Sequence, residues 1–194
     1  YDGQVLAGEE DVVVVTVTYR LNIFGFPGGP ETTQNLGLRD QRMAVEWVRD
    51  NIASFGGDSS RIVIFGQSSG GVAVDYWAYA YREDPIVSGL VSHSGNALSF
   101  PLNDPDRQVS NWYNVTRTLG CGSDNSTLAC MRTRNWSDIL QAASRLPATP
   151  GGSPVRSTPA FYPKVDDETV FSNYGERSRA GQFARLVSSP CAQV

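Results

Sequence analysis

Two runs of apolar, mostly β-branched residues frame a segment with helical spacing in the first third of the chain. Residues 11–19 contain Val-Val-Val-Val-Thr-Val-Thr-Tyr, and residues 61–65 read Arg-Ile-Val-Ile-Phe. Runs without polar alternation are typical of strands buried on both faces of a parallel sheet. Between them, apolar residues recur every three or four positions from about Leu36 to Ala53, which predicts a helix. The succession predicts a parallel α/β sheet in which residues 11–19 form a central strand.

The βα pattern weakens after one more apolar strand, which is predicted at residues 89–93. Beyond it the spacing is helical and more polar, around residues 112–119 and 136–146, and a segment rich in Pro, Gly and Ser follows. We therefore expect residues 1–100 to form the core segment of an α/β domain. Residues 101–194 are expected to form a helical and loop cap or insertion of the same domain.

Composition narrows the classes of function. The chain has 194 residues, of which 40% are hydrophobic, and a formal net charge of −4. Its arginines are interleaved with acids and form no basic block, so nucleic acid is not an expected partner. No apolar run approaches the roughly 18 residues that a membrane-crossing helix needs, so no transmembrane segment is predicted.

The pentapeptide Gly66-Gln67-Ser68-Ser69-Gly70 fits the G-x-S-x-G pattern of a nucleophile elbow. It lies between a predicted strand and an apolar segment that predicts a helix, which is the context such an elbow requires. A tight strand-to-helix turn exposes the serine hydroxyl beside backbone N–H groups that can stabilise an oxyanion. We therefore predict that Ser68 is a nucleophile, and that Gly66 and Gly70 leave room for the turn.

The rest of a catalytic triad is harder to find. In α/β-hydrolases the triad runs in the order Ser, acid, His, but the single histidine of this chain is His93. Neighbouring residues of a strand point to opposite faces, so if Ser94 faces the site His93 does not, and we interpret His93 as a structural residue at a strand end. The acidic residues after Ser68 are interpreted as surface or turn positions: Asp75, Asp84, Asp104, Asp166, Asp167 and Glu168.

Three N-x-S/T sequons, at Asn114, Asn125 and Asn135, lie near Cys121 and Cys130. Sequons also occur by coincidence, but three of them beside two cysteines favour a secreted glycoprotein. A disulfide between the two cysteines could close the short polar loop that they flank. The chain offers no second cysteine pair and no set of histidines, so no metal site is predicted, and the role of its third cysteine, at position 191, stays open.

Several ordered segments resemble the type-B carboxylesterase/lipase family, the cholinesterase-like α/β-hydrolases, and are most similar to its secreted fungal members. The segments that carry the likeness, in family order, are residues 15–26, 35–42, 47–58, 65–71 and 92–95. The resemblance implies an α/β-hydrolase fold, a mostly parallel sheet with helices on both faces, here incomplete. It also implies hydrolysis of a small-molecule or lipid ester without a cofactor.

The same resemblance assigns roles to individual residues. Ser68 would be the acylated nucleophile, and the backbone N–H of Ser69 would donate to the oxyanion. Gln67 stands where the family usually has glutamate, which puts the hydrogen bonding beneath the elbow in doubt. Ser94 matches a supporting serine near the acid of the triad.

The resemblance also implies that the family's glycine-rich oxyanion loop, triad acid and catalytic histidine lie outside these 194 residues. Residues 187–194 look like neither the strand nor the acid loop expected near that point. We therefore interpret the chain as an internal fragment of a carboxylesterase or lipase. Two alternatives are a catalytically inactive cholinesterase-like binding domain and a truncated product without function. The sequence leaves the acyl and alcohol preference and the oligomeric state open.

Overall fold

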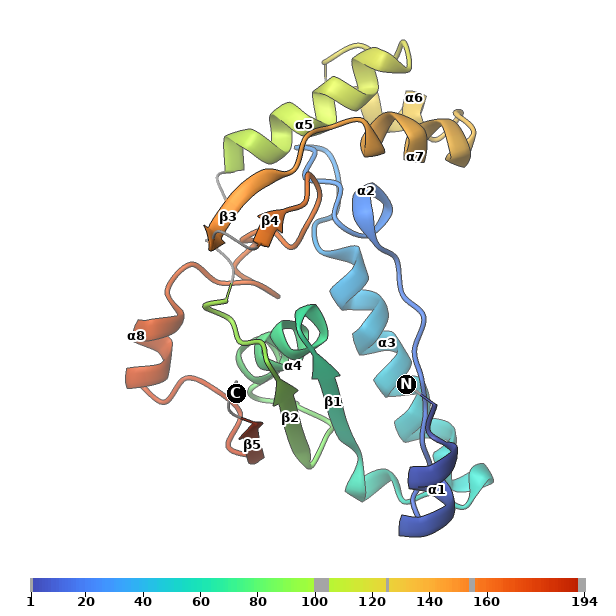
Figure 1. Cartoon of the computed structure of the whole chain (residues 1–194), viewed down its shortest axis with the longest axis vertical. Helices are drawn as coiled ribbons and strands as arrows, with labels where there is room; N and C mark the ends of the chain where they lie inside the picture. The colour runs from blue at the N-terminus through green and yellow to red at the C-terminus, as the bar shows by residue number, and fades with distance from the viewer. Residues whose placement is uncertain (1, 100–104, 125, 154–155, 192–194) are drawn as a thin grey trace. The chain divides into compact units, whose positions relative to one another are not determined.

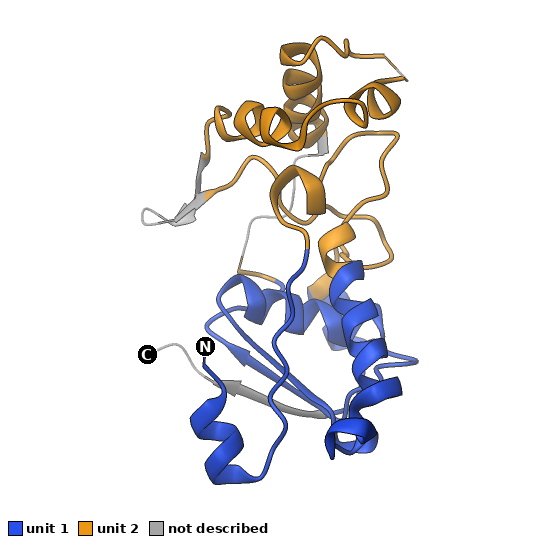
Figure 2. Cartoon of the chain, turned by 90° about the vertical axis from the view of Figure 1, so that its right-hand side faces the viewer, with its two compact units in different colours: residues 1–19, 39–97, 175–194 blue, residues 20–38, 98–174 orange. Residues whose placement is uncertain are grey.

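The computed structural model describes residues 2–99, 105–124, 126–153 and 156–191 (Figure 1). The chain divides into two compact units (Figure 2). Unit 1 comprises residues 1–19, 39–97 and 175–194, and unit 2 comprises residues 20–38 and 98–174. Because both units are assembled from separate stretches of chain, the expected division at residue 100 into core and cap stays a prediction.

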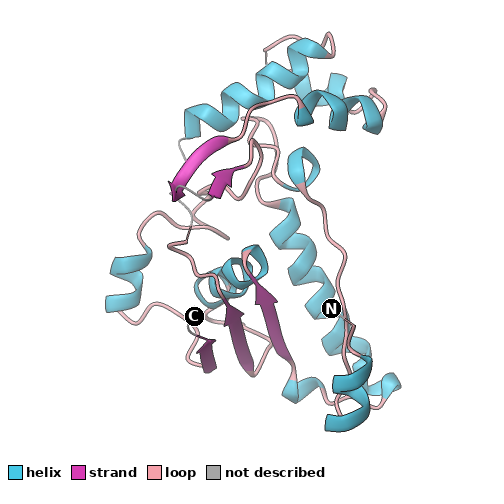
Figure 3. Ribbon diagram, in the orientation of Figure 1, coloured by secondary structure: helices cyan, strands magenta, loops and turns pink. Residues whose placement is uncertain are grey.

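A parallel sheet of three strands forms the centre of unit 1. Its order is β1 (Val63–Gln67), β2 (Gly89–His93) and β5 (Val187–Cys191) (Figure 3). In the β1–β2 register, Val63 lies opposite Gly89 and Gln67 lies opposite His93. The parallel α/β arrangement and the strands expected around residues 61–65 and 89–93 are thus confirmed.

Strand β5 corrects the interpretation of residues 187–194, which were expected to form neither strand nor acid loop. Residues 187–191 pair in parallel with β2, with Val187 opposite Gly89. The sequence Val-Ser-Ser-Pro-Cys is a poor strand by composition, but pairing uses backbone groups. Among the residues that the structure describes, strand β5 is paired with β2 on one side and with no strand on the other. An edge tolerates Pro190, which has no N–H to contribute.

The stretch expected to be a central strand is not one. After α1 (Gln4–Glu10), residues 12–21 have no regular secondary structure. Its valines at positions 12, 13, 15 and 17 are 39–47% exposed. Within the part of the chain that the structure describes, no strand pairs with this stretch. A β-branched run becomes a strand by pairing and packing, because its propensity depends on neighbours rather than on the backbone alone.

The helix predicted from the spacing of apolar residues before β1 is present. Helix α3 (Leu36–Asn51) occupies the expected range, and the 3₁₀ turns Ile52–Phe55 and Ser59–Arg61 lead from it to β1. Helix α4 (Ser69–Ala80) follows the elbow and packs against β1 and β2. The core of unit 1 consists of apolar side chains from α3, α4 and the β2 region: Val45, Val74, Trp77, Ala78, Val87 and Leu90.

Unit 2 has its own, mainly helical core. Its elements are α2 (Asn22–Gly25), α5 (Pro105–Thr118), α6 (Thr127–Met131), α7 (Trp136–Ser144) and an antiparallel pair, β3 (Thr149–Ser153) with β4 (Arg156–Thr158). The core side chains include Ile23, Trp112, Val115, Met131, Ile139 and Phe161. Helix α8 (Tyr174–Arg179) begins at the last residue of unit 2 and continues in unit 1. The helices predicted around residues 112–119 and 136–146 are present as α5 and α7.

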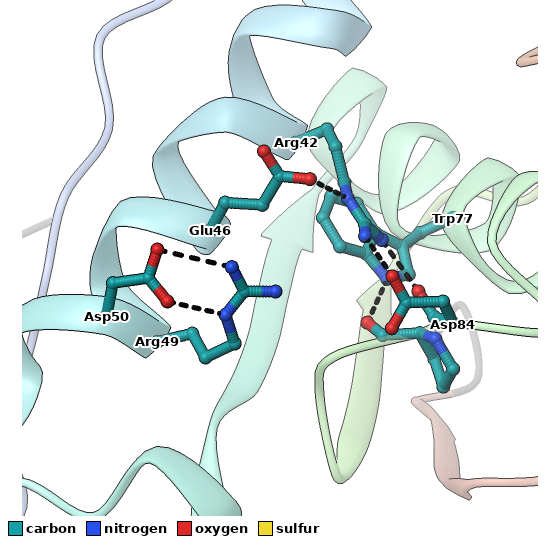
Figure 4. A network of polar contacts seen from close by, with 7 residues as sticks. Arg42, Glu46, Arg49, Asp50, Trp77 and Asp84 are labelled. Atoms are coloured by element: carbon teal, nitrogen blue, oxygen red, sulfur yellow. Dashed lines mark hydrogen bonds and ion pairs between the residues drawn. The ribbon is translucent and has the colours of Figure 1, made fainter.

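Arg42 of α3 contacts α4 and the turn after it inside unit 1 (Figure 4). The Arg42 side chain, only 14% exposed, donates from Nε to Glu46 at 2.8 Å and from Nη2 to the Asp84 carboxylate at 2.6 Å. Its guanidinium carbon lies 4.4 Å from the ring centre of Tyr81 and 5.6 Å from that of Trp77. This planar cation therefore combines stacking with hydrogen bonds, which a lysine cannot reproduce.

We predict that Arg42→Ala lowers the free energy of unfolding by about 2 kcal/mol, because packing and hydrogen bonds are lost together. Arg42→Lys should recover less than half of that loss. The matched control is Arg49→Ala, since Arg49 is an exposed residue of the same helix that pairs with its neighbour Asp50. Urea unfolding measures all three variants, and equal losses at the two arginines would contradict the assignment.

In unit 2 a carboxylate organises the turn at residues 166–170. One Asp166 oxygen accepts hydrogen bonds from the N–H groups of Thr169 at 2.7 Å and Val170 at 2.9 Å, and the other accepts from the Thr169 hydroxyl at 2.8 Å. Burial alone would raise the pKa of Asp166, but these hydrogen bonds outweigh it and hold the pKa below its usual value. The Thr169 hydroxyl also accepts from the buried Asn35 amide at 2.9 Å. The turn is thereby tied to the segment that precedes α3.

Asp166→Ala is expected to lower the free energy of unfolding by about 1–3 kcal/mol at neutral pH, because buried N–H groups lose their acceptor. A carboxyl whose pKa is lowered by folding adds stability above its unfolded pKa and loses it as the pH falls through its folded pKa. The difference in the free energy of unfolding between wild type and Asp166→Ala should therefore shrink below about pH 4. Asp167→Asn, at an exposed neighbour, is the control. Urea unfolding between neutral pH and the acid range should give it the same free energy of unfolding as wild type.

Candidate active site

The backbone at Ser68 is strained. Strand β1 ends at Gln67 and α4 begins at Ser69, so Ser68 alone makes the turn, with φ of 57° and ψ of −116°. Non-glycine residues rarely adopt such angles, at a cost of about 1–3 kcal/mol, and they persist only where the surroundings fix them. The Ser68 hydroxyl does not cap α4, although Ser68 holds the N-cap position. The geometry is that of a serine presented at a strand-to-helix turn.

Hydrogen bonds on both sides hold this conformation. The Ser68 N–H donates to the backbone carbonyl of His93 at 2.8 Å, which extends the β1–β2 pairing by one step. The Ser68 carbonyl accepts from the Val72 N–H at 3.0 Å and so closes the first turn of α4. Both polar groups of the Ser68 backbone are therefore fixed, one by the sheet and one by the helix.

The first turn of α4 supplies backbone donors. N–H groups at the start of a helix have no acceptor within the helix, and the helix dipole makes this end favourable for negative charge. Ser69 is the first residue of α4 and is exposed. Its expected role as an oxyanion donor fits this position and stays a prediction.

Close backbone contacts explain one of the two elbow glycines. A Cβ at Gly66 would lie 2.5 Å from the carbonyl carbon and oxygen of Gly70, whereas a Cβ at Gly70 would meet nothing within 4 Å. Space is thus required at Gly66 but not at Gly70. Gly95 also has no room, because its Cβ would collide with the carbonyl oxygen of Ser68. Sequence reasoning gave Gly95 no role, since nothing local signals a contact with a residue 27 positions away.

Gly95→Ala is predicted to destabilise the fold by about 1–3 kcal/mol, because the elbow or the loop must move to admit the methyl group. The matched change Gly70→Ala should leave stability unchanged or raise it by up to about 1 kcal/mol, since alanine favours a helix. Thermal and urea unfolding of both variants tests the contrast. Equal stability of the two would contradict the tight contact at Gly95.

The loop after β2 is anchored to the elbow by two side chains. The Ser92 hydroxyl lies 3.0 Å from the Gly71 carbonyl oxygen and also close to that of Gly95. From α4, an Asp75 carboxylate oxygen accepts the Ala97 N–H at 2.7 Å. Asp75 was interpreted as a surface or turn residue, and the structure corrects this: it is half-buried in α4, and burial raises the pKa of its carboxyl.

The other expected site residues lie at the ends of β1 and β2. Gln67 is the last residue of β1 and its side chain is exposed. Ser94, half-buried with φ of 55°, directly follows β2. His93 is the last residue of β2, and its backbone carbonyl binds Ser68. The supporting roles expected for Gln67 and Ser94, and the structural reading of the His93 side chain, stay predictions.

The polar segment of unit 2 contains a disulfide between Cys121 and Cys130, whose Cα atoms are 5.5 Å apart. Asn135 is exposed, and its side chain caps α7 by accepting from the Ser137 N–H at 3.0 Å. Asn114 is half-buried in α5, where its side-chain oxygen accepts from Arg117 at 2.6 Å. The third sequon asparagine, Asn125, lies outside the described residues. Glycosylation of the three stays a prediction.

Among the described residues, no group of three or more His, Cys, Asp or Glu side chains is arranged to hold a metal ion. None of the described helices is both long and apolar enough to cross a membrane. The backbone of Cys191 lies in β5, but its side chain lies outside what the structure describes.

Known proteins are similar to this chain in sequence and in fold. The family model described as "Carboxylesterase family" matches residues 1–182. The chain belongs to the carboxylesterase family. The crystal structure of Aspergillus niger EstA matches it with a TM-score of 0.80 and 28% identity, covering 97% of this chain and 38% of EstA. The fold is therefore that of the α/β-hydrolases, with a partial sheet in this chain.

Individual carboxylesterase relatives are named as esterases and lipases. A chlorogenic acid esterase of Aspergillus niger is 41% identical over 177 residues, covering 90% of this chain and 33% of the esterase. Secreted lipase 5 of Gibberella zeae is 41% identical over 177 residues, covering 85% of this chain and 32% of the lipase. The chain thus belongs to a family of ester hydrolases and spans about a third of the length of these relatives.

Proposed function

We propose that Ser68 is the nucleophile of a serine carboxylic-ester hydrolase and that this chain supplies the acylation centre of its site. The observation that supports this most strongly is the strained Ser68 backbone, held between β1 and α4 with its hydroxyl free of capping. Strain of this kind persists where the surroundings enforce it, as is expected of the serine in a nucleophile elbow.

In the proposed reaction, the Ser68 Oγ attacks the carbonyl carbon of an ester while a base accepts its proton. The carbonyl electron pair moves to the oxygen, and the resulting oxyanion accepts a hydrogen bond from the Ser69 N–H. Collapse of the tetrahedral intermediate expels the alcohol, which takes up the proton, and leaves an acyl group on Ser68. Water then attacks the acyl-enzyme and releases the acid.

The base and acid are proposed to come from sequence beyond these 194 residues. His93 is the single histidine of the chain, and its backbone carbonyl already binds the Ser68 N–H. A family triad places its histidine after the acid, whereas His93 follows Ser68 by 25 positions at the end of the next strand. We therefore give His93 a structural role and expect slow turnover from this chain alone.

The substrate class is proposed from the relatives, whose names describe esterases and lipases. A small-molecule or lipid ester fits both, and the chemistry needs no cofactor. The secreted lipase among the relatives, together with the disulfide and the sequons, supports a secreted glycoprotein.

We expect a fluorophosphonate probe to label the purified chain at Ser68 at least about tenfold faster than at any other serine, because helix N–H donors stabilise the phosphoryl oxygen. Ser68→Ala should abolish this labelling. Ser69→Ala is the matched control and should keep it, since the substitution leaves the backbone N–H in place. Peptide mass spectrometry after timed exposure locates the label.

Equal labelling of wild type and Ser68→Ala in folded samples would overturn the proposed nucleophile and favour a non-catalytic binding domain. Hydrolysis of p-nitrophenyl butyrate provides a second measurement on the same samples. A rate reduced by several orders of magnitude in Ser68→Ala would show that a base is present after all, at His93 or in a partner chain, and would overturn the assignment of the base to other sequence.

A further inference from the structure

Asp75 is a half-buried carboxyl that the proposed reaction does not use. It lies on α4 seven residues after Ser68, so its Cα is about 10 Å along the helix axis from the Cα of Ser68. One carboxylate oxygen of Asp75 accepts a hydrogen bond from the Ala97 N–H at 2.7 Å. Ala97 is only 2% exposed, so the donor end of this hydrogen bond is buried. The carboxyl is thereby bound to the loop after β2.

That loop contacts the nucleophile directly. Gly95 lies against the Ser68 carbonyl so closely that a Cβ could not fit, and a Cβ there would also lie 3.0 Å from the Val72 nitrogen. These two atoms form the hydrogen bond that closes the first turn of α4. Ser92 fixes the start of the loop, and Asp75 fixes its end. The loop is therefore held at both ends, and between them Gly95 packs against the Ser68 backbone, which has the strained angles.

The negative charge of Asp75 does not stabilise the folded chain. Burial raises the pKa of the carboxyl, so the carboxylate is less favourable in the folded chain than in the unfolded one. A group of this kind loses stabilising effect as the pH rises through its folded pKa, the reverse of Asp166. Asp75 is the one charged residue of α4, and residues 94–97 carry no charge. An asparagine would avoid the desolvation cost while keeping an acceptor for Ala97.

We propose that Asp75 is a positioning residue for acyl transfer: by holding the Ala97 N–H it keeps residues 94–97 packed on the Ser68 carbonyl and so preserves the elbow. The inference rests on the proposed function, because it concerns the reactivity of Ser68. Asp75 contacts neither the substrate nor the reacting atoms. Its effect passes through the loop, and an uncharged acceptor of the same shape should reproduce it.

The test compares Asp75→Leu, which removes the acceptor, with Asp75→Asn, which keeps one. Asp50→Asn, at an exposed aspartate of α3, is the control. Hydrogen exchange measured by mass spectrometry on peptides covering residues 92–99 reports the loop, and fluorophosphonate labelling reports Ser68. We expect Asp75→Leu to speed Ala97 amide exchange and to slow labelling, each by at least about tenfold, which corresponds to about 1.4 kcal/mol. Asp75→Asn and Asp50→Asn should stay within about threefold of wild type in labelling.

The outcomes separate the two proposals. If labelling of Ser68 keeps its wild-type rate in Asp75→Leu while the loop exchanges faster, the positioning role is wrong and the nucleophile stands. If wild type labels no faster than Ser68→Ala, the proposed function fails and this inference fails with it. If hydrogen exchange in the β1 and β2 peptides shows that Asp75→Leu does not fold, Asp75→Ser replaces it. Loss of Ser68 labelling in Asp75→Asn would also overturn the proposal.

Discussion

The hydrogen bond from the Ser68 N–H to the His93 carbonyl is the contact on which the site depends. It joins the last step of β1 to the end of β2, so the turn that follows cannot relax without breaking the sheet. On the other side, the Val72 N–H holds the Ser68 carbonyl in the first turn of α4. A residue fixed by a strand and a helix at once can be kept in an unfavourable conformation, and its strain is balanced by the packing around it.

The packing that balances this strain comes from both sides of the α4 N-terminus. Gly66 and Gly95 allow two other backbone segments to approach the turn, and a side chain at either position would force them apart. Further along, apolar side chains of α4 join the core that includes Val87 and Leu90, so the helix cannot slide away from the sheet. The Arg42 network then fixes α3 to α4 and to the turn that leads into β2. Core, sheet and elbow therefore support one another within unit 1.

The sequence predicted the features that depend on residues close together in the chain. Helix α3 follows from apolar spacing over four turns, and the elbow follows from a strand, two glycines and a helix within a few residues. Residues 11–19 failed as a strand because a strand needs a partner, which no pattern within the run supplies. Strand β5 was missed for the opposite reason, since backbone pairing with β2 outweighs a weak composition. The roles of Gly95 and Asp75 depend on residues 27 and 22 positions away, beyond the reach of any local pattern.

The geometry of Ser68 and the proton transfer that its reaction requires are separate problems. The backbone hydrogen bonds that hold Ser68, among the residues that the structure describes, join residues 63–93 of one compact unit. Proton transfer is a separate requirement, because a hydroxyl at this turn is well placed but weakly nucleophilic until a base accepts its proton. In the proposed reaction, N–H donors at the turn stabilise the charge that develops on the substrate, whereas a base generates the attacking oxygen. The contacts that fix the Ser68 backbone are therefore local to one unit, whereas activation of its hydroxyl depends on where a base lies.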